Sequence, residues 1–420
     1  MLSSINNYEP KNLREKQKTN FKGITIPAST RFLDGFVKSQ ENLSTTRFIQ
    51  DTTTNWLPKA ALSRSKADFW EFSLLEFVES GLFYFAAPVL GEHLFRNKIF
   101  NKIQPKQIMN NVTKSTSEIK KSALDATTKN KSIATKAGII TACLAVPAME
   151  YALSFAKNLF TLKVFHLSDF NNVANLNSEQ KEDEAQQNKV ETHAKKELKK
   201  AGVLSAAGIG AGILLATHGH KSKTALKFSE ALLNPAEPIK KGLHKVGLKS
   251  KKFDKFLEDY TKLDFDNKNG KFALSKGQLA LTAITGLFGY SEAAKDRGKL
   301  DFYEVWTRVP LVVLYTIFGS AVFDEGFKKI LAKNGKFPDL IKKSNDGSIN
   351  VPSRKELPNI AEQVALKNNT SSKKELEKLI KQKSIITGVP YLFSLVAMGF
   401  TLTAVTRLWT KYRYEHQFDK

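Results

Sequence analysis

Hydrophobic residues in this chain are gathered into six runs, separated by long polar stretches rich in Lys, Asn, Ser and Thr. The runs cover residues 80–91, 137–156, 201–217, 277–291, 309–323 and 384–406. A capping side chain followed three residues later by an acid or Gln precedes the first, fourth and fifth runs: Ser65 with Asp68, Ser275 with Gln278, and Asp301 with Glu304. We therefore expect each run to be a helix.

The sixth run is the strongest indication of a membrane. Its twenty-three uncharged residues, 384–406, lie between Lys383 and Arg407, and as a helix they would extend ~34 Å, enough to cross a hydrocarbon layer of ~30 Å. Trp409 and Tyr412 follow, as is typical of an interfacial anchor. The shorter runs, taken alone, would also suit buried helices of a soluble protein. Together with the sixth they predict an all-α, multi-pass helical membrane bundle of about six apolar helices, with basic extramembrane helical segments.

The polar stretches set the organisation that we predict around these helices. Residues 1–64 have no sustained helical period, so we expect a loosely ordered tail. A helical membrane region follows at 65–325, and a basic polar insertion at 326–383. In this interpretation 384–408 is a transmembrane helix and 409–420 is a short polar C-terminal tail.

The net charge of +24 comes from 65 Lys and Arg residues against 41 Asp and Glu residues, and only ten of the basic residues are Arg. Lys acts as a hydrated point charge, whereas readout of bases relies on the planar guanidinium of Arg. Lys-rich loops therefore suit attraction to anionic lipid. A solvated Lys-rich surface without a partner is an equal alternative, and nucleic acid is the least favoured partner.

Residues Asn20, Phe21, Lys22 and Gly23 form a short motif near the N-terminus. It resembles a motif of an uncharacterised group of bacterial membrane proteins. The resemblance covers four residues and implies no activity, cofactor or site residue. It does imply a location in the bacterial inner membrane, which agrees with a multi-pass bundle whose main partner is the lipid bilayer.

Three carboxylates lie in or beside the apolar runs: Glu76, Glu79 and Glu150. A carboxylate facing hydrocarbon is costly, so acids in spanning helices usually face a bundle interior, an aqueous path or a basic partner. Glu76 and Glu79 fall on one face of a helix, and with Glu150 they are candidates for an ion or proton pathway. The favoured alternative is an amphipathic helix at 66–79 whose acids face water. For Glu150 the alternative is an interfacial ion pair with Lys157.

The third run contains Gly208, Gly210 and Gly212, which include a Gly-x-x-x-Gly pattern. Small residues allow helix backbones to approach closely. We therefore predict a packing surface, either within the chain or with a second copy of it as a homo-oligomer. The spacing differs from that of nucleotide-binding glycine loops.

No combination of nucleophile and base typical of an enzyme can be recognised in the sequence. His218 and His220 offer two imidazoles, but a zinc site needs three or four ligands, and Cys143 has no nearby His. We therefore expect no catalytic residues, no metal and no cofactor. The favoured function is a non-catalytic structural or interaction role at the membrane. The alternative is a transporter or channel that uses the three carboxylates.

Overall fold

The computed structural model describes residues 30–41, 48–49, 52–178, 181–268, 271–343 and 349–416. The predicted all-α class is confirmed, since the described strands form only two short antiparallel pairs. The N-terminal motif at residues 20–23 lies outside the described residues. The chain divides into two units, each with its own core.

The smaller unit combines Met1–Glu41 with Phe327–Thr387. Its described elements are α1 (Arg31–Glu41), the end of α17 (Ser320–Lys333), β3 (Lys342–Lys343), β4 (Ile349–Asn350), α18 (Leu357–Asn368) and most of α19 (Ser372–Phe393). Leu340, Leu357 and Leu379 are fully buried in its core. Asp34 and Arg354 form a buried ion pair between α1 and the segment before α18. The stretch predicted as a polar insertion thus contributes to a hydrophobic core.

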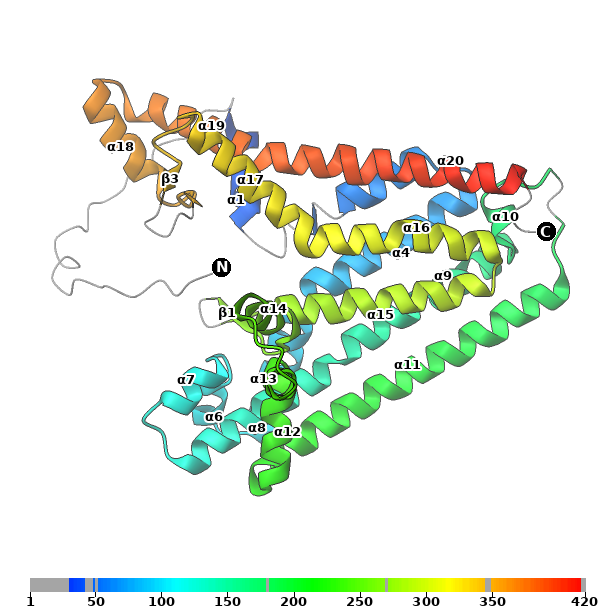
Figure 1. Cartoon of the computed structure of the whole chain (residues 1–420), viewed down its shortest axis with the longest axis horizontal. Coiled ribbons are helices and arrows are strands. Elements are labelled where there is room, and N and C mark those ends of the chain that lie inside the picture. The colour runs from blue at the N-terminus through cyan, green and yellow to red at the C-terminus, as the bar shows by residue number, and fades with distance from the viewer. Residues whose placement is uncertain are drawn as a thin grey trace. The chain divides into compact units, whose positions relative to one another are not determined.

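The larger unit, Asn42–Gly326 with Gly388–Lys420, is a helical bundle. Its long helices are α4 (Lys66–Phe85), α8 (Ala126–Cys143), α9 (Ala145–Phe165), α11 (Glu184–His218), α15 (Lys276–Lys295), α16 (Lys299–Leu314) and α20 (Leu402–Glu415). In Figure 1, α11 packs against α8 and α9, α15 packs against α9 and α16, and α20 packs against α16. Helix α4 also packs against α9.

Shorter elements complete the larger unit. The short α-helices are α3 (Leu57–Ala61), α5 (Asn101–Ile103), α6 (Lys106–Asn111), α7 (Thr116–Lys121), α10 (Phe170–Val173), α12 (Lys223–Leu233), α13 (Ala236–Lys245) and α14 (Lys251–Thr261). Wider π-helical turns form η2 (Thr52–Trp56), η3 (Ala86–Phe100), η5 (Tyr315–Gly319) and η6 (Ser394–Thr401), and η4 (Gly219–Lys221) is a 3₁₀ turn. Strands β1 (Asp266–Lys268) and β2 (Lys271–Ala273) pair antiparallel, with Asn267 opposite Phe272.

Two of the three predicted helix starts are confirmed. Ser65 Oγ accepts a hydrogen bond of 3.0 Å from the Asp68 amide, and Ser275 forms a complete capping box before α15. The prediction that Asp301 and Glu304 open the fifth helix is wrong. Helix α16 begins at Lys299, after Gly298 with φ of 122°, and both acids lie inside the helix. Their carboxylates bind arginines instead of backbone amides.

Among the described residues, three helices are long and apolar enough to cross a membrane: Ala126–Phe165, Glu184–Lys221 and Ser372–Glu415. A fourth span would be the pair Lys66–Phe85 and Val89–Ile103, which is bent by 55°. The prediction of about six spans is therefore wrong. The fourth and fifth runs each have only fifteen uncharged residues, which cover about 22 Å of helix, less than the ~30 Å of a hydrocarbon layer.

Candidate functional site

A cavity of about 110 Å³ lies inside the larger unit, between α4, α15 and α16. Five carboxylates line it: Glu71, Glu76, Glu79, Asp301 and Glu304. Three cations line it as well: Lys59, Lys157 and Arg308. Charged groups away from water are costly unless they are paired, so the pairing of these eight side chains decides what the cavity can bind.

Glu71 of α4 is the centre of one buried ion-pair network. Its Oε1 lies 2.8 Å from Arg297 Nη1 and 3.0 Å from Lys157 Nζ, and its Oε2 accepts a 2.8 Å hydrogen bond from Thr161. Arg297, just beyond the end of α15, also donates to Asn158 Oδ1 at 3.1 Å. Glu71 is 3% exposed and Arg297 2%. The network therefore joins α4, α9 and the end of α15 within the core.

Arg297 also faces Asp301 in the first turn of α16, with 3.4 Å between Nε and Oδ2. Burial lowers the pKa of Arg297, but the charges of Glu71 and Asp301 outweigh burial, so the pKa lies above its ordinary value. Burial raises the pKa of Asp301, and the attraction of Arg297 does not fully reverse this rise. Asp301 is therefore easier to protonate than a carboxyl in water.

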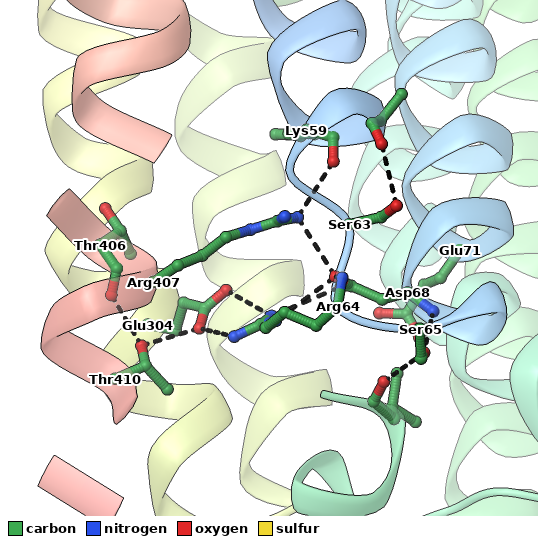
Figure 2. Close-up of polar contacts among 12 residues, drawn as sticks. Lys59, Ser63, Arg64, Ser65, Asp68, Glu71, Glu304, Thr406, Arg407 and Thr410 are labelled. Carbon is green, nitrogen blue, oxygen red and sulfur yellow. Dashed lines mark hydrogen bonds and ion pairs between the residues drawn. The ribbon is translucent and has the colours of Figure 1, made fainter. Parts of the chain in front are cut away.

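A second network, drawn in Figure 2, links the segment before α4 with α16 and α20. Arg64 forms two parallel bonds with Glu304, 2.9 Å from Nη1 to Oε2 and 3.0 Å from Nη2 to Oε1. Asp68 accepts a 2.9 Å hydrogen bond from the Arg64 amide and lies 3.2 Å from Arg407 Nη2. Thr410 of α20 donates to Glu304 at 2.8 Å. Paired bonds of this kind are strong and directional, so they fix the three helices together.

The charges in this second network stabilise one another. Burial lowers the pKa of Arg64, but Glu304 and Asp68 raise it above its ordinary value overall. Burial raises the pKa of Glu304, whereas Arg64 lowers it, and the net pKa lies below its ordinary value. Both partners are thus held in their charged forms at neutral pH.

Glu76 and Glu79, two of the predicted pathway residues, lie together at the cavity. Glu76 is 3% exposed and forms an ion pair with Lys59 of α3. Glu79 is half-buried and accepts a 2.6 Å hydrogen bond from the Tyr290 hydroxyl of α15. The alternative of an amphipathic helix whose acids face water is therefore wrong for Glu76, because α4 turns this acid towards α3 and the cavity.

Glu150, the third predicted carboxylate, is fully buried on α9 but is not among the residues that line the cavity. It packs against α15, where a Cβ atom added to Gly286 would lie 3.0 Å from Glu150 Oε1. The interfacial alternative for Glu150 does not hold, because the side chain is 0% exposed and Lys157 pairs with Glu71. The structure brings Glu76 and Glu79 together and places Glu150 apart from them.

The predicted glycine surface lies where α11 crosses α8. A Cβ atom added to Gly212 would lie 2.4 Å from the carbonyl oxygen of Gly138, and one added to Gly208 would lie 3.2 Å from that of Thr141. Gly210 has nothing within 4 Å of an added Cβ atom. Gly208 and Gly212 therefore permit close backbone approach within the chain, whereas Gly210 points away from this crossing. Contact with a second copy of the chain stays a prediction.

Arg308 of α16 is not part of either network. It is 8% exposed, and no residue in the described part of the chain forms a hydrogen bond or an ion pair with it. Burial lowers its pKa, and the positive charge of Arg407 lowers it further. A guanidinium nevertheless stays charged at neutral pH. The cavity therefore contains one positive charge without a counter-ion from the described chain.

The sequence interpretation missed the arginines of this site. Arg297 lies 226 residues from Glu71, and Arg64 lies 240 residues from Glu304, so no local spacing indicates either pair. The rarity of Arg was the available signal, because only ten occur in the chain. Arg is preferred over Lys for buried ion pairs, so a rare Arg next to an apolar run is a reasonable candidate for a buried partner.

No protein-family model matches the chain, and no curated protein or solved structure is significantly similar to it. Among the described residues, no group of three or more His, Cys, Asp or Glu side chains is arranged to hold a metal ion. The apolar helices, the two networks and the cavity are therefore the features from which a function can be inferred.

Proposed function

We propose that the chain is an integral membrane protein with a non-catalytic structural or interaction role, and that its long apolar helices contact lipid. The observation that carries this proposal is the outward position of apolar residues. Only 17% of the most apolar stretch of Glu184–Lys221 is buried, and only 22% of that of Ser372–Glu415. Large exposed apolar patches are unusual on a protein in water. The same surface is stable in a hydrocarbon layer.

Helix α11 illustrates this pattern. Val203, Leu204 and Leu214 are 61%, 65% and 64% exposed, whereas Gly212 on the same helix lies against α8. The helix thus packs through its small residues and turns its large apolar residues outward. This distribution is typical of membrane bundles, in which the hydrophobic effect does not drive helix association and small residues form the contacts.

The buried charges also support the proposal. Ionisable residues within membrane bundles usually face the interior and pair with one another, as Glu71 does with Arg297 and Glu304 does with Arg64. By contrast, Ala126–Phe165 has 61% of its most apolar stretch buried, which suits a central helix surrounded by the others. Lipid then contacts the outer helices.

Alkaline carbonate extraction of membranes that contain the full-length chain tests this proposal. The protein is expected in the pellet with integral membrane proteins. The double variant Val203→Lys, Leu214→Lys should give much less membrane-integrated protein, because a Lys near the centre of a spanning helix costs about 2.5–3.5 kcal/mol. The matched control Asn188→Lys, Thr192→Lys changes exposed polar positions of the same helix and should behave as the wild type. Recovery of most wild-type protein in the soluble fraction would contradict the proposal.

A transporter or channel is the second candidate, and one observation favours it: Glu76 and Glu79 line a cavity inside the bundle. Proton flux into proteoliposomes that contain the full-length protein, followed with a pH-sensitive dye, tests this function. Transport predicts flux that falls in Glu76→Gln and Glu79→Gln but not in Glu184→Gln, which changes an exposed acid on α11. Flux no greater than that of empty liposomes would exclude proton transport and favour the structural role.

A further inference from the structure

The cavity in the larger unit has a charged side and an apolar side. The carboxylates and cations described above form the charged side. Leu75 and Phe83 of α4, and Val309, Val312 and Val313 at the end of α16, contribute the apolar side. Arg308 immediately precedes these valines on α16. A molecule held by Arg308 would therefore have apolar side chains beside it.

Among the described residues, four of the five carboxylates at the cavity pair with cations, and Glu79 accepts a hydrogen bond from Tyr290. Glu71 is paired with Lys157 and Arg297, Glu76 with Lys59, and Glu304 with Arg64. Arg308 is 8% exposed and lines the cavity, and no described residue neutralises it. A buried cation without a counter-ion is strongly unfavourable. The folded chain therefore presents a fixed positive charge where an anion can be received.

We propose that Arg308 anchors a binding site for a small organic monoanion, a carboxylate that carries a short apolar group. The planar guanidinium fork of Arg matches the two oxygens of a carboxylate. A single negative charge fits best, because five carboxylates line the same cavity and would repel a dianion. The apolar group would contact Val309 and Val312.

The size of the cavity limits the ligand. Its volume is about 110 Å³, somewhat less than the ~150 Å³ of an apolar cavity that holds benzene. A carboxylate with three further carbon atoms, such as butyrate, is of suitable size, whereas a long acyl chain is too large. Chloride would satisfy the charge but would leave the apolar side without contacts. The inference depends on the cavity alone and not on whether the chain is embedded in a membrane.

Calorimetry and thermal unfolding of the purified full-length protein test the proposal, with sodium butyrate as the probe. Butyramide, which is neutral, and sodium chloride at equal ionic strength are the comparison compounds. Butyrate should bind and raise the unfolding temperature in a concentration-dependent way, and the two comparison compounds should not. Detergent is needed if the protein is embedded in a membrane, and aqueous buffer suffices otherwise, so a failed membrane proposal leaves this test intact.

Three variants locate the site. Arg308→Gln should weaken butyrate binding on the order of 10- to 100-fold, as expected for loss of a charge-assisted hydrogen-bonded pair. Val312→Phe should abolish butyrate binding, because the larger side chain fills the apolar side of the cavity while Arg308 remains. The control Arg413→Gln removes an arginine of α20 that stacks on Tyr303 and Trp409 and should leave the affinity unchanged.

The protein without ligand gives an independent readout. Arg308→Gln should be at least as stable as the wild type in the absence of butyrate, because it removes a buried charge that no described residue neutralises. A clear loss of stability, with no effect of butyrate on the wild type, would show that Arg308 has a structural role and would overturn the proposal. If chloride raised the unfolding temperature of the wild type as much as butyrate does, the proposal of an organic ligand would be overturned. Undiminished butyrate binding by Val312→Phe would place the site elsewhere, even if Arg308→Gln failed to fold.

Discussion

Replacing Arg297 by Met should destabilise the larger unit more than any comparable change at the surface. The side chain is 2% exposed and holds Glu71 at 2.8 Å, Asn158 at 3.1 Å and Asp301 at 3.4 Å. Arg297→Met keeps much of the volume but leaves two buried carboxylates short of a cation. Glu71 retains Lys157 and Thr161, whereas Asp301 has no other ion pair among the described residues.

The expected loss of stability follows from the cost of removing one partner of a buried ion pair, about 3–5 kcal/mol. The larger unit has roughly 320 residues, and unfolding gains about 2.1 cal/mol/K per residue near the midpoint. The midpoint of thermal unfolding should therefore fall by roughly 4–8 °C. Arg413→Met, the same change at a half-exposed arginine of α20, should lower it by a small fraction of that amount.

The loss of stability in Arg297→Met should also depend on pH, because it changes the protonation of Asp301. Its pKa is already raised by burial despite the charge of Arg297, and removal of Arg297 raises it further. A carboxyl with a raised pKa destabilises the fold above that pKa, and the penalty disappears as the pH falls through it. Arg297→Met should therefore be closer to the wild type at pH 5 than at pH 8. Differential scanning calorimetry in detergent measures this, and a variant as stable as the wild type, or a loss independent of pH, would refute the reasoning.

Three further predictions concern other parts of the chain. Glu150→Gln should unfold within a few degrees of the wild type in a thermal scan, because it keeps the shape of a fully buried side chain, whereas Glu150→Lys should be much less stable; equal midpoints would show that the site is not closed. Gly212→Leu should abolish the close crossing with α8 and lower the yield of folded protein, whereas Gly210→Leu should be tolerated, because only the first has backbone in the way of an added Cβ atom. Burial raises the pKa of Asp34, but hydrogen bonds from Lys38 and Arg354 lower it more, so its stabilisation of the smaller unit should be present at neutral pH and be lost as the pH falls below about 4. The protection of α18 amides against hydrogen exchange, relative to their intrinsic rates at each pH, should therefore fall in acid for the wild type and be low at neutral pH in Asp34→Asn.

The sequence predicted those features that depend on residues close together in the chain. The caps at Ser65 and Ser275 depend on a side chain and an amide three residues away, so the pattern alone predicts them. The same spacing at Asp301 and Glu304 was misleading, because Asp301 pairs with Arg297, four residues before it, and Glu304 pairs with Arg64, 240 residues away. The local pattern therefore predicted the positions of the helices better than the partners of their polar side chains.

The cavity could not be predicted, because its charged side chains pair with residues of other helices. Glu76 and Glu79 were recognised as unusual acids, but their partners, Lys59 and Tyr290, come from a preceding short helix and from a helix about two hundred residues later. Arg308 is distinguished by the lack of a partner among the described residues, a property that exists only in three dimensions. The number of spans was overestimated for a related reason, since an apolar run of fifteen residues fits a buried helix as well as a short span.

Cysteine accessibility in intact membrane vesicles tests the proposed membrane embedding most directly. Cys143 is the only native cysteine, so single cysteines can be introduced in a Cys143→Ala background. Val396 is 59% exposed on η6, and Glu415 is exposed at the end of α20. A water-soluble maleimide should label Glu415→Cys readily and leave Val396→Cys unmodified until the membrane is dissolved. Labelling of Val396→Cys at the same rate as Glu415→Cys in intact vesicles would contradict the account.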